Sequence, residues 1–188
     1  MRIVAGEFRG RPLRTPAGEA IRPTSDRVRQ TIFDILAHSY GDPVVGARVL
    51  DLFAGTGALG LEAISRGALS VLFVEDGVEA RSLIRTNVEA FGLTGRTRVF
   101  RRDATRLGDV GNLPPFTLVF VDPPYGQGLG ERALAAAVAG GWLAKGAIVV
   151  LEEAADARVD PVKGLEALET RRIGDTAIHF LAVGPVRP

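Results

Sequence analysis

Residues 51–60 read DLFAGTGALG, and this stretch decides the fold. It follows a short apolar segment at 48–52 and leads into a helical pattern over 58–65. Its glycines match the pattern G-x-G-x-x-G: Gly55, Gly57 and Gly60. Glycines at a strand-to-helix turn let the backbone approach a bound nucleotide closely. The stretch therefore predicts a Rossmann-like α/β domain.

The segments on either side of this loop alternate between strand and helix patterns. We expect helices at 26–39, 78–91 and 131–139, and further strands at 70–75, 97–100, 116–121, 147–152, 168–173 and 177–183. Such alternation is typical of a parallel sheet with helices on both faces. The turn signal Gly174-Asp175 joins the last two strands and indicates antiparallel pairing. We predict a mostly parallel, seven-stranded sheet with an antiparallel edge strand.

The composition excludes several classes of protein. The 188 residues include no cysteine and only two histidines. The sequence therefore excludes disulfides and a zinc site built from cysteine and histidine ligands. No apolar run reaches the roughly 18 residues of a membrane-spanning helix, and the first residues lack the apolar segment of a signal peptide. We expect a cytoplasmic monomer with no metal ion and no membrane contact.

The net charge of +1 conceals an uneven distribution. Residues 1–30 hold seven arginines and three acids, a net of +4, and a second arginine cluster lies at 96–106. Arginine binds phosphates bidentately, so nucleic-acid binding is one interpretation. Genomic base composition is the other, because arginines outnumber lysines 21 to 2. We expect residues 1–24 to form an arm that precedes a main domain at 25–188.

Three acids stand at the ends of the predicted strands, where a nucleotide would bind. Glu75 lies 20 residues beyond Gly55 and is placed to accept from ribose hydroxyls. Asp51 would repel a pyrophosphate, so the loop favours S-adenosylmethionine, which carries a sulfonium and an ammonium, over NAD. Asp103 either accepts from the adenine amino group or caps a helix. The alternative is that the glycines only allow close helix packing.

The segment Asp122-Pro123-Pro124-Tyr125 follows an almost wholly apolar strand. Consecutive prolines continue neither a strand ladder nor a helix, so they fix a rigid turn. This turn presents two acceptors, the Asp122 carboxylate and the Pro123 carbonyl, to which a planar amino group can donate. Tyr125 adds an aromatic face for a base. The alternative is an ordinary Pro-Pro turn with a solvated acid.

The two motifs together resemble the S-adenosylmethionine-dependent amino methyltransferases, which act on exocyclic nitrogens of bases. The sequences RGRPL at 9–13, RPTSDRVRQT at 22–31, ALGLEA at 58–63 and GWL at 141–143 resemble the RsmD family of 16S ribosomal RNA guanine-N2 methyltransferases. The resemblance covers nearly the whole chain. Ser25 is a mild departure, since threonine is as common there.

This resemblance implies the class I methyltransferase fold and a role for each motif. The catalytic residues would be Asp122, Pro123, Pro124 and Tyr125. Contacts to S-adenosylmethionine would come from Thr24, Asp51, Phe53, Gly55, Gly57, Glu75, Asp76, Asp103 and Ala104. The arm would contact ribosomal RNA, with Arg9, Arg11, Arg22, Arg27 and Arg29 as the RNA-binding residues.

Three other functions stay open at this stage. The Asp-Pro-Pro-Tyr motif alone also fits an amino methyltransferase that acts on adenine N6 in DNA or RNA. An NAD-dependent oxidoreductase would need a hydride-handling Tyr-Lys or His arrangement, and the two lysines and two histidines form none. A non-catalytic RNA-binding module would need neither a donor pocket nor Asp122.

Overall fold

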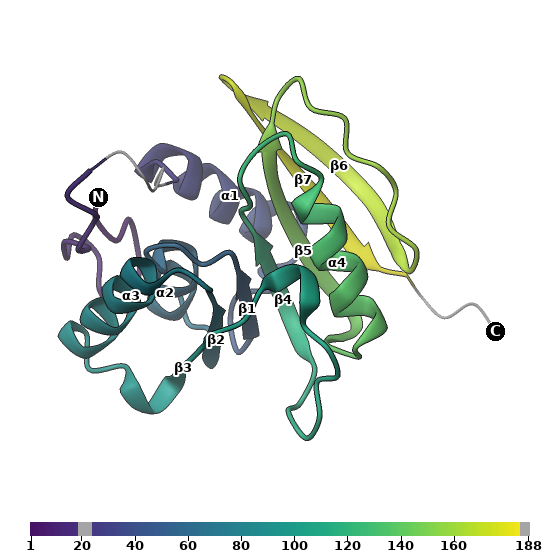
Figure 1. The fold of residues 1–188 in the computed structure, drawn as a ribbon. Coiled ribbons are helices and arrows are strands. Elements are labelled where there is room, and N and C mark those ends of the chain that lie inside the picture. The colour runs from purple at the N-terminus through teal and green to yellow at the C-terminus, as the bar shows by residue number, and fades with distance from the viewer. Residues whose placement is uncertain (19–23, 185–188) are drawn as a thin grey trace.

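The computed structural model describes residues 1–18 and 24–184 (Figure 1). The helices are α1 (Asp26–Ser39), α2 (Ala58–Ser65), α3 (Val78–Ala90) and α4 (Leu129–Ala139), with 3-10 turns η1 (Thr94–Arg96) and η2 (Ala104–Arg106). The strands are β1 (Arg48–Leu52), β2 (Ser70–Val74), β3 (Thr97–Phe100), β4 (Phe116–Val121), β5 (Leu143–Ala154), β6 (Leu165–Ile173) and β7 (Thr176–Val183).

The seven strands form one sheet in the order β3-β2-β1-β4-β5-β7-β6. The pairs from β3 through β5 are parallel, and β7 pairs antiparallel with both β5 and β6. The mostly parallel sheet and the antiparallel pairing at its edge are confirmed. The last strand of the chain lies one place inside that edge, because the hairpin folds back and leaves β6 outermost (Figure 1).

Two hydrophobic cores lie on opposite faces of the sheet. On one face, side chains of α1, α2 and α3 pack against residues such as Val49 and Phe120. On the other face, α4 and η2 pack against residues such as Leu50 and Val119. Neighbouring residues of one strand enter different cores because side chains alternate across a sheet. The predicted helices on both faces are confirmed (Figure 1).

Two strands begin earlier than the sequence predicts. β5 begins at Leu143 rather than 147, and its pairing with β4 shifts register beyond Phe116. Lys145 and Gly146 are exposed there and interrupt the apolar pattern. β6 begins at Leu165 rather than 168, and most of its side chains are exposed. A strand that pairs on one side and buries little carries a weak hydrophobic signal.

The N-terminal arm packs against α2 and α3. Ile3 and Leu13 are buried in the core beside these helices. The backbone N–H groups of Val4 and Ala5 donate to the Glu62 carboxylate at 2.9 and 3.0 Å. The arm is therefore held at a fixed place beside α2. Within the two described ranges, no helix has the length and apolar character needed to cross a membrane.

Candidate active site

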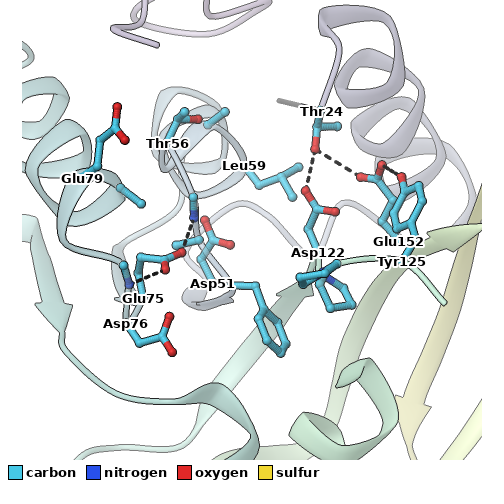
Figure 2. Close-up of a pocket in the computed structure, with 18 of the residues that line it drawn as sticks. Thr24, Asp51, Thr56, Leu59, Glu75, Asp76, Glu79, Asp122, Tyr125 and Glu152 are labelled. Carbon is cyan, nitrogen blue, oxygen red and sulfur yellow. Dashed lines mark hydrogen bonds between the residues drawn. The ribbon is translucent and has the colours of Figure 1, made fainter. Parts of the chain in front are cut away.

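A cavity of about 710 Å³ opens at the carboxyl ends of the parallel strands. Open α/β sheets bind ligands at this edge. The segments that follow β1, β2 and β4 line it, together with the start of α1 and the end of the parallel part of β5. Figure 2 shows that Glu75 and Asp51 lie toward one end and Asp122 and Tyr125 toward the other. The cavity thus joins the glycine loop to the Asp122 turn.

The glycine loop is tied to the end of β2 by one carboxylate. The N–H of Gly55 donates to Glu75 Oε2 at 2.9 Å, and the N–H of Gly77 donates to Glu75 Oε1 at 2.9 Å. Gly55 and Gly57 have φ values of +58° and +80°, a region that favours glycine. Gly55 and Glu75 are therefore neighbours, whereas the N–H of Gly57 donates to the carbonyl of Ala54 at 2.8 Å, and Gly57 is not among the residues that line the cavity. Gly55 and Glu75 line the cavity.

Asp51 lies in the cavity wall at the end of β1, and it is 1% exposed. Its Oδ2 accepts a hydrogen bond from the N–H of Gly60 at 3.0 Å, so its carboxylate has a partner. Burial raises the pKa of Asp51 well above its ordinary value, the bond from Gly60 opposes this rise, and nearby Glu75 adds to it. A cation in the cavity would favour the ionised form.

At the other end, one hydroxyl bridges two carboxylates. Thr24 Oγ1 donates to Asp122 Oδ2 at 2.9 Å and lies 3.2 Å from Glu152 Oε2 (Figure 2). Thr24 is predicted to contact S-adenosylmethionine, yet its hydroxyl lies at the Asp122 end of the cavity. Asp122 follows β4 directly, and its N–H donates to the carbonyl of Leu52 at 3.4 Å. This bond holds the turn beside the neighbouring strand.

Tyr125 is anchored by its hydroxyl. The phenol donates to Glu152 Oε1 at 2.5 Å and lies 3.1 Å from Thr176 Oγ1. The pKa of Tyr125 is raised mainly by burial and, to a smaller extent, by the hydrogen bond to the Glu152 carboxylate. The phenol therefore stays protonated at neutral pH and holds its ring beside Asp122 in the cavity wall (Figure 2). Pro123 and Pro124 line the same wall.

Glu152 and Thr176 are site residues that the sequence analysis misses. Val121 pairs with Leu151 across β4 and β5, so Glu152 follows at the same level as Asp122. Glu152 is 6% exposed and lines the cavity. The sequence feature that indicates Glu152 is the abrupt change from an apolar strand to acidic residues at 152 and 153. Thr176 belongs to the antiparallel β7 and carried no comparable signal.

Asp103 and Ala104 line a second, small hollow with Phe53 and Asp76. Phe53 and Asp76 also line the main cavity, so the two spaces are neighbours. Asp103 caps η2, because its Oδ1 accepts from the N–H and the hydroxyl of Thr105 at 2.8 and 2.7 Å. These bonds lower the pKa of Asp103. The capping role is confirmed, and the contact to an adenine amine stays a prediction.

The predicted RNA-binding arginines differ in exposure. Arg9 and Arg27 are exposed. Arg11 donates to the carbonyl of Ala90 at 2.6 Å and lies over the Phe91 ring at 4.4 Å, while it stays exposed. Arg22 lies outside the described residues. Arg29 corrects the prediction: it is 0% exposed and therefore cannot contact an RNA phosphate.

The strand order and the site at its carboxyl edge define a class I methyltransferase. The solved structure of the 16S rRNA methyltransferase RsmC from Thermus thermophilus has this fold, with a TM-score of 0.64 and 22% identity over 85% of this chain and 43% of that chain. The solved structure of the Escherichia coli protein yhhF is more similar. It has a TM-score of 0.81 and 34% identity, and the match covers 97% of both chains.

Two sequence comparisons narrow the class to a family. The family model described as conserved hypothetical protein 95 matches residues 1–182. Ribosomal RNA small subunit methyltransferase D of Escherichia coli (strain K12) is 37% identical over 183 residues, which cover 96% of this chain and 88% of that protein. The chain therefore belongs to the RsmD family.

Proposed function

We propose that this methyltransferase transfers the methyl group of S-adenosylmethionine to the exocyclic N2 of a guanine in small-subunit ribosomal RNA. The observation that carries the proposal is the placement of Asp122, Glu152 and Tyr125 around one end of a cavity whose other end is the glycine loop. The names of relatives such as the Escherichia coli methyltransferase D support small-subunit RNA as the substrate.

The residues at the glycine-loop end fit S-adenosylmethionine. Asp51 is a buried carboxylate in the cavity wall, and because burial raises its pKa, a positive charge beside it would stabilise the ionised form. The ammonium and sulfonium would supply that charge. Glu75, Asp76 and Phe53 line the cavity at this end; the two acids would accept from ribose hydroxyls, and Phe53 would border the adenine. When bound, S-adenosylmethionine supplies the electrophilic methyl group.

The Asp122 end fits an amino group whose nitrogen is a poor nucleophile. Hydrogen bonds from N2–H to the Asp122 carboxylate and the Pro123 carbonyl would stabilise the positive charge that develops on the nitrogen. Asp122 can then accept the proton that leaves N2. Much of the acceleration would come from residues that hold the nitrogen in line with the methyl group, at about the 3–3.5 Å of a near-attack geometry. Tyr125 would stack on the guanine base, which must be extruded from the RNA helix to reach the site.

The carboxylates favour guanine over adenine. The Watson–Crick edge of guanine carries N1–H beside N2–H, whereas in adenine the N1 lone pair lies beside N6–H. Glu152 places a second carboxylate within reach of the Thr24 hydroxyl that contacts Asp122. The N–H donors on the guanine edge suit this wall of carboxylate acceptors, whereas the N1 lone pair of adenine would be repelled by the carboxylates. The exposed Arg9, Arg11 and Arg27, with Arg22, would pair with RNA phosphates.

The replacement of Asp122 by alanine distinguishes the binding of S-adenosylmethionine from the transfer of its methyl group. We expect Asp122→Ala to lose transfer by more than 100-fold, because it removes charge stabilisation at the nitrogen, and to bind S-adenosylmethionine within about 2-fold of the wild type. Asp156→Ala, at an exposed turn, is the matched control. Loss of donor binding with unchanged turnover per bound complex would contradict the assignment.

A further inference from the structure

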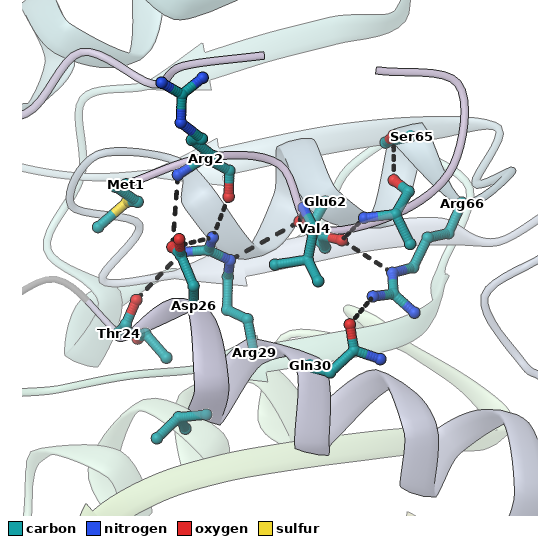
Figure 3. Close-up of polar contacts among 12 residues, drawn as sticks. Met1, Arg2, Val4, Thr24, Asp26, Arg29, Gln30, Glu62, Ser65 and Arg66 are labelled. Carbon is teal, nitrogen blue, oxygen red and sulfur yellow. Dashed lines mark hydrogen bonds and ion pairs between the residues drawn. The ribbon is translucent and has the colours of Figure 1, made fainter. Parts of the chain in front are cut away.

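A buried arginine stands behind the catalytic end of the cavity. Arg29 lies on α1 and is 0% exposed. Its guanidinium donates from Nη1 to the carbonyl of Thr24 at 3.1 Å, and from Nη2 to the carbonyl of Arg2 at 2.5 Å and to Asp26 Oδ1 at 2.7 Å (Figure 3). A buried charge is tolerated only when it is paired and hydrogen-bonded. One side chain thus links Arg2 near the N-terminus to Thr24 and to Asp26, the first residue of α1.

Asp26 and Glu62 are both counter-charges of Arg29, and Glu62 also anchors the arm. Glu62 is 0% exposed in the middle of α2, and its Oε2 lies 3.8 Å from Arg29 Nε. The same carboxylate accepts from the N–H groups of Val4 and Ala5 and from Arg66 Nε at 2.9 Å (Figure 3). Arm, α1 and α2 therefore meet at one buried ion pair.

Thr24 connects this ion pair to Asp122. Its carbonyl accepts from Arg29, while its hydroxyl donates to Asp122 Oδ2 at 2.9 Å. Ser25, the next residue, caps α1 by accepting from the N–H of Val28 at 3.2 Å. Thr24 thus has its backbone held on one side and its hydroxyl aimed into the cavity on the other. The direction of that hydroxyl depends on where Arg29 holds the carbonyl.

We propose that Arg29 is a positioning residue for methyl transfer: it sets Thr24 so that the hydroxyl orients the Asp122 carboxylate, and Glu62 links this setting to the arm. The inference rests on the proposed role of Asp122 at the methyl acceptor. It assigns to the buried guanidinium of Arg29 a task inside the protein, in place of RNA binding. Arg29 touches neither substrate and acts through Thr24.

A double-mutant cycle on the rate of transfer tests this coupling. Arg29→Lys keeps the positive charge but lacks the planar fork that reaches two carbonyls at once. We expect kcat to fall about 10-fold or more, because small displacements of a positioning group are costly in rate, while KM for RNA and the affinity for S-adenosylmethionine change less than about 2-fold. Thr24→Val should lower kcat similarly, and Thr24→Ser should restore it.

The decisive variant combines both changes. If Arg29 acts through Thr24, Arg29→Lys lowers kcat no further in the Thr24→Val background. Effects that multiply, or a change confined to KM for RNA, would overturn the proposal. Should Arg29→Lys fail to fold, Glu62→Gln completes the same cycle, since it removes the buried negative charge beside Arg29 and keeps an acceptor oxygen for one of the two N–H groups, that of Val4 or that of Ala5.

The readout keeps this proposal separate from the proposed function. The cycle is measured as labelled methyl groups incorporated into RNA, whichever base receives them. Nucleoside analysis of the same samples identifies the base. A product other than N2-methylguanosine would refute the proposed function, while the coupling between Arg29 and Thr24 would still be supported or contradicted by the rates.

Discussion

At Gly60, α2 packs closely against β2, and the replacement of this glycine by alanine has a calculable effect. A Cβ atom at Gly60 would lie 2.5 Å from Phe73 Cε1, 2.8 Å from Val71 Cγ1 and 3.1 Å from Asp51 Oδ2. Carbon atoms in contact lie about 3.5–4.0 Å apart. Phe73 and Val71 are at most 2% exposed, so neither can move into solvent. The helix must therefore shift away from the strand.

The shift has a thermodynamic cost and a functional one. Overpacking a core costs about 1–3 kcal/mol. The bond from the Gly60 N–H to Asp51 is stretched as well, which adds about 1 kcal/mol. A total of about 2–4 kcal/mol corresponds to a fall in Tm of about 4–16 °C for a chain of this size. Affinity for S-adenosylmethionine should fall too, because Asp51 loses its anchor.

Thermal unfolding and calorimetric titration with S-adenosylmethionine measure the two effects. Gly95→Ala is the matched control, because a Cβ there meets no atom within 4 Å, and its Tm should stay within about 2 °C of the wild type, as expected for an unstrained glycine replacement. A Gly60→Ala protein with unchanged Tm and unchanged donor affinity would refute the argument that this glycine permits close helix packing beside Asp51.

Three further predictions follow from the site. Because the pKa of Asp51 is raised, the folded state binds its proton more tightly than the unfolded state does, so the free energy of unfolding falls as pH rises from 3.8 toward the raised pKa. Asp51→Asn should flatten this fall, measured as Tm against pH. A Tm profile unaltered by the substitution would contradict the prediction. Arg9→Gln with Arg27→Gln should reduce the slope of log affinity for RNA against log salt by about 1.4–1.8, whereas Arg158→Gln should leave it unchanged; equal slopes for all three proteins would exclude a phosphate role. Tyr125→Phe should lower kcat by about 10-fold or less, since the ring remains for stacking, and Tyr125→Ala should lower it further, stacking being worth about 1–3 kcal/mol; equal rates for the two variants would remove the stacking role.

Local patterns were sufficient to predict the architecture. Strands such as β4 are almost wholly apolar, and apolar residues recur every three to four positions in helices such as α1, so these elements show their type within their own sequence. The glycine loop and the Asp122 turn were also predictable, because each is a contiguous motif at the end of a strand. Their meeting in one cavity follows from the parallel arrangement, which brings strand ends to one edge of the sheet.

Burial and long-range pairing were harder to predict. The arginine-rich arm and the family resemblance together placed Arg29 with the RNA-binding arginines, although it shares the buried stripe of α1 with Ile32, Phe33 and Leu36. That three-to-four residue spacing was the available signal. The role of Glu152 depends on the register of β5 against β4, which a single sequence does not specify. Thr24 reaches Asp122 across 98 positions in the chain, a contact that no local pattern contains.

Nucleoside analysis of small-subunit RNA, methylated by the purified protein with labelled S-adenosylmethionine, tests the central claim most directly. The account predicts that the label is found in N2-methylguanosine at a single position, and that Asp122→Ala transfers none. Label in N6-methyladenosine, or equal transfer by the wild type and Asp122→Ala, would contradict it.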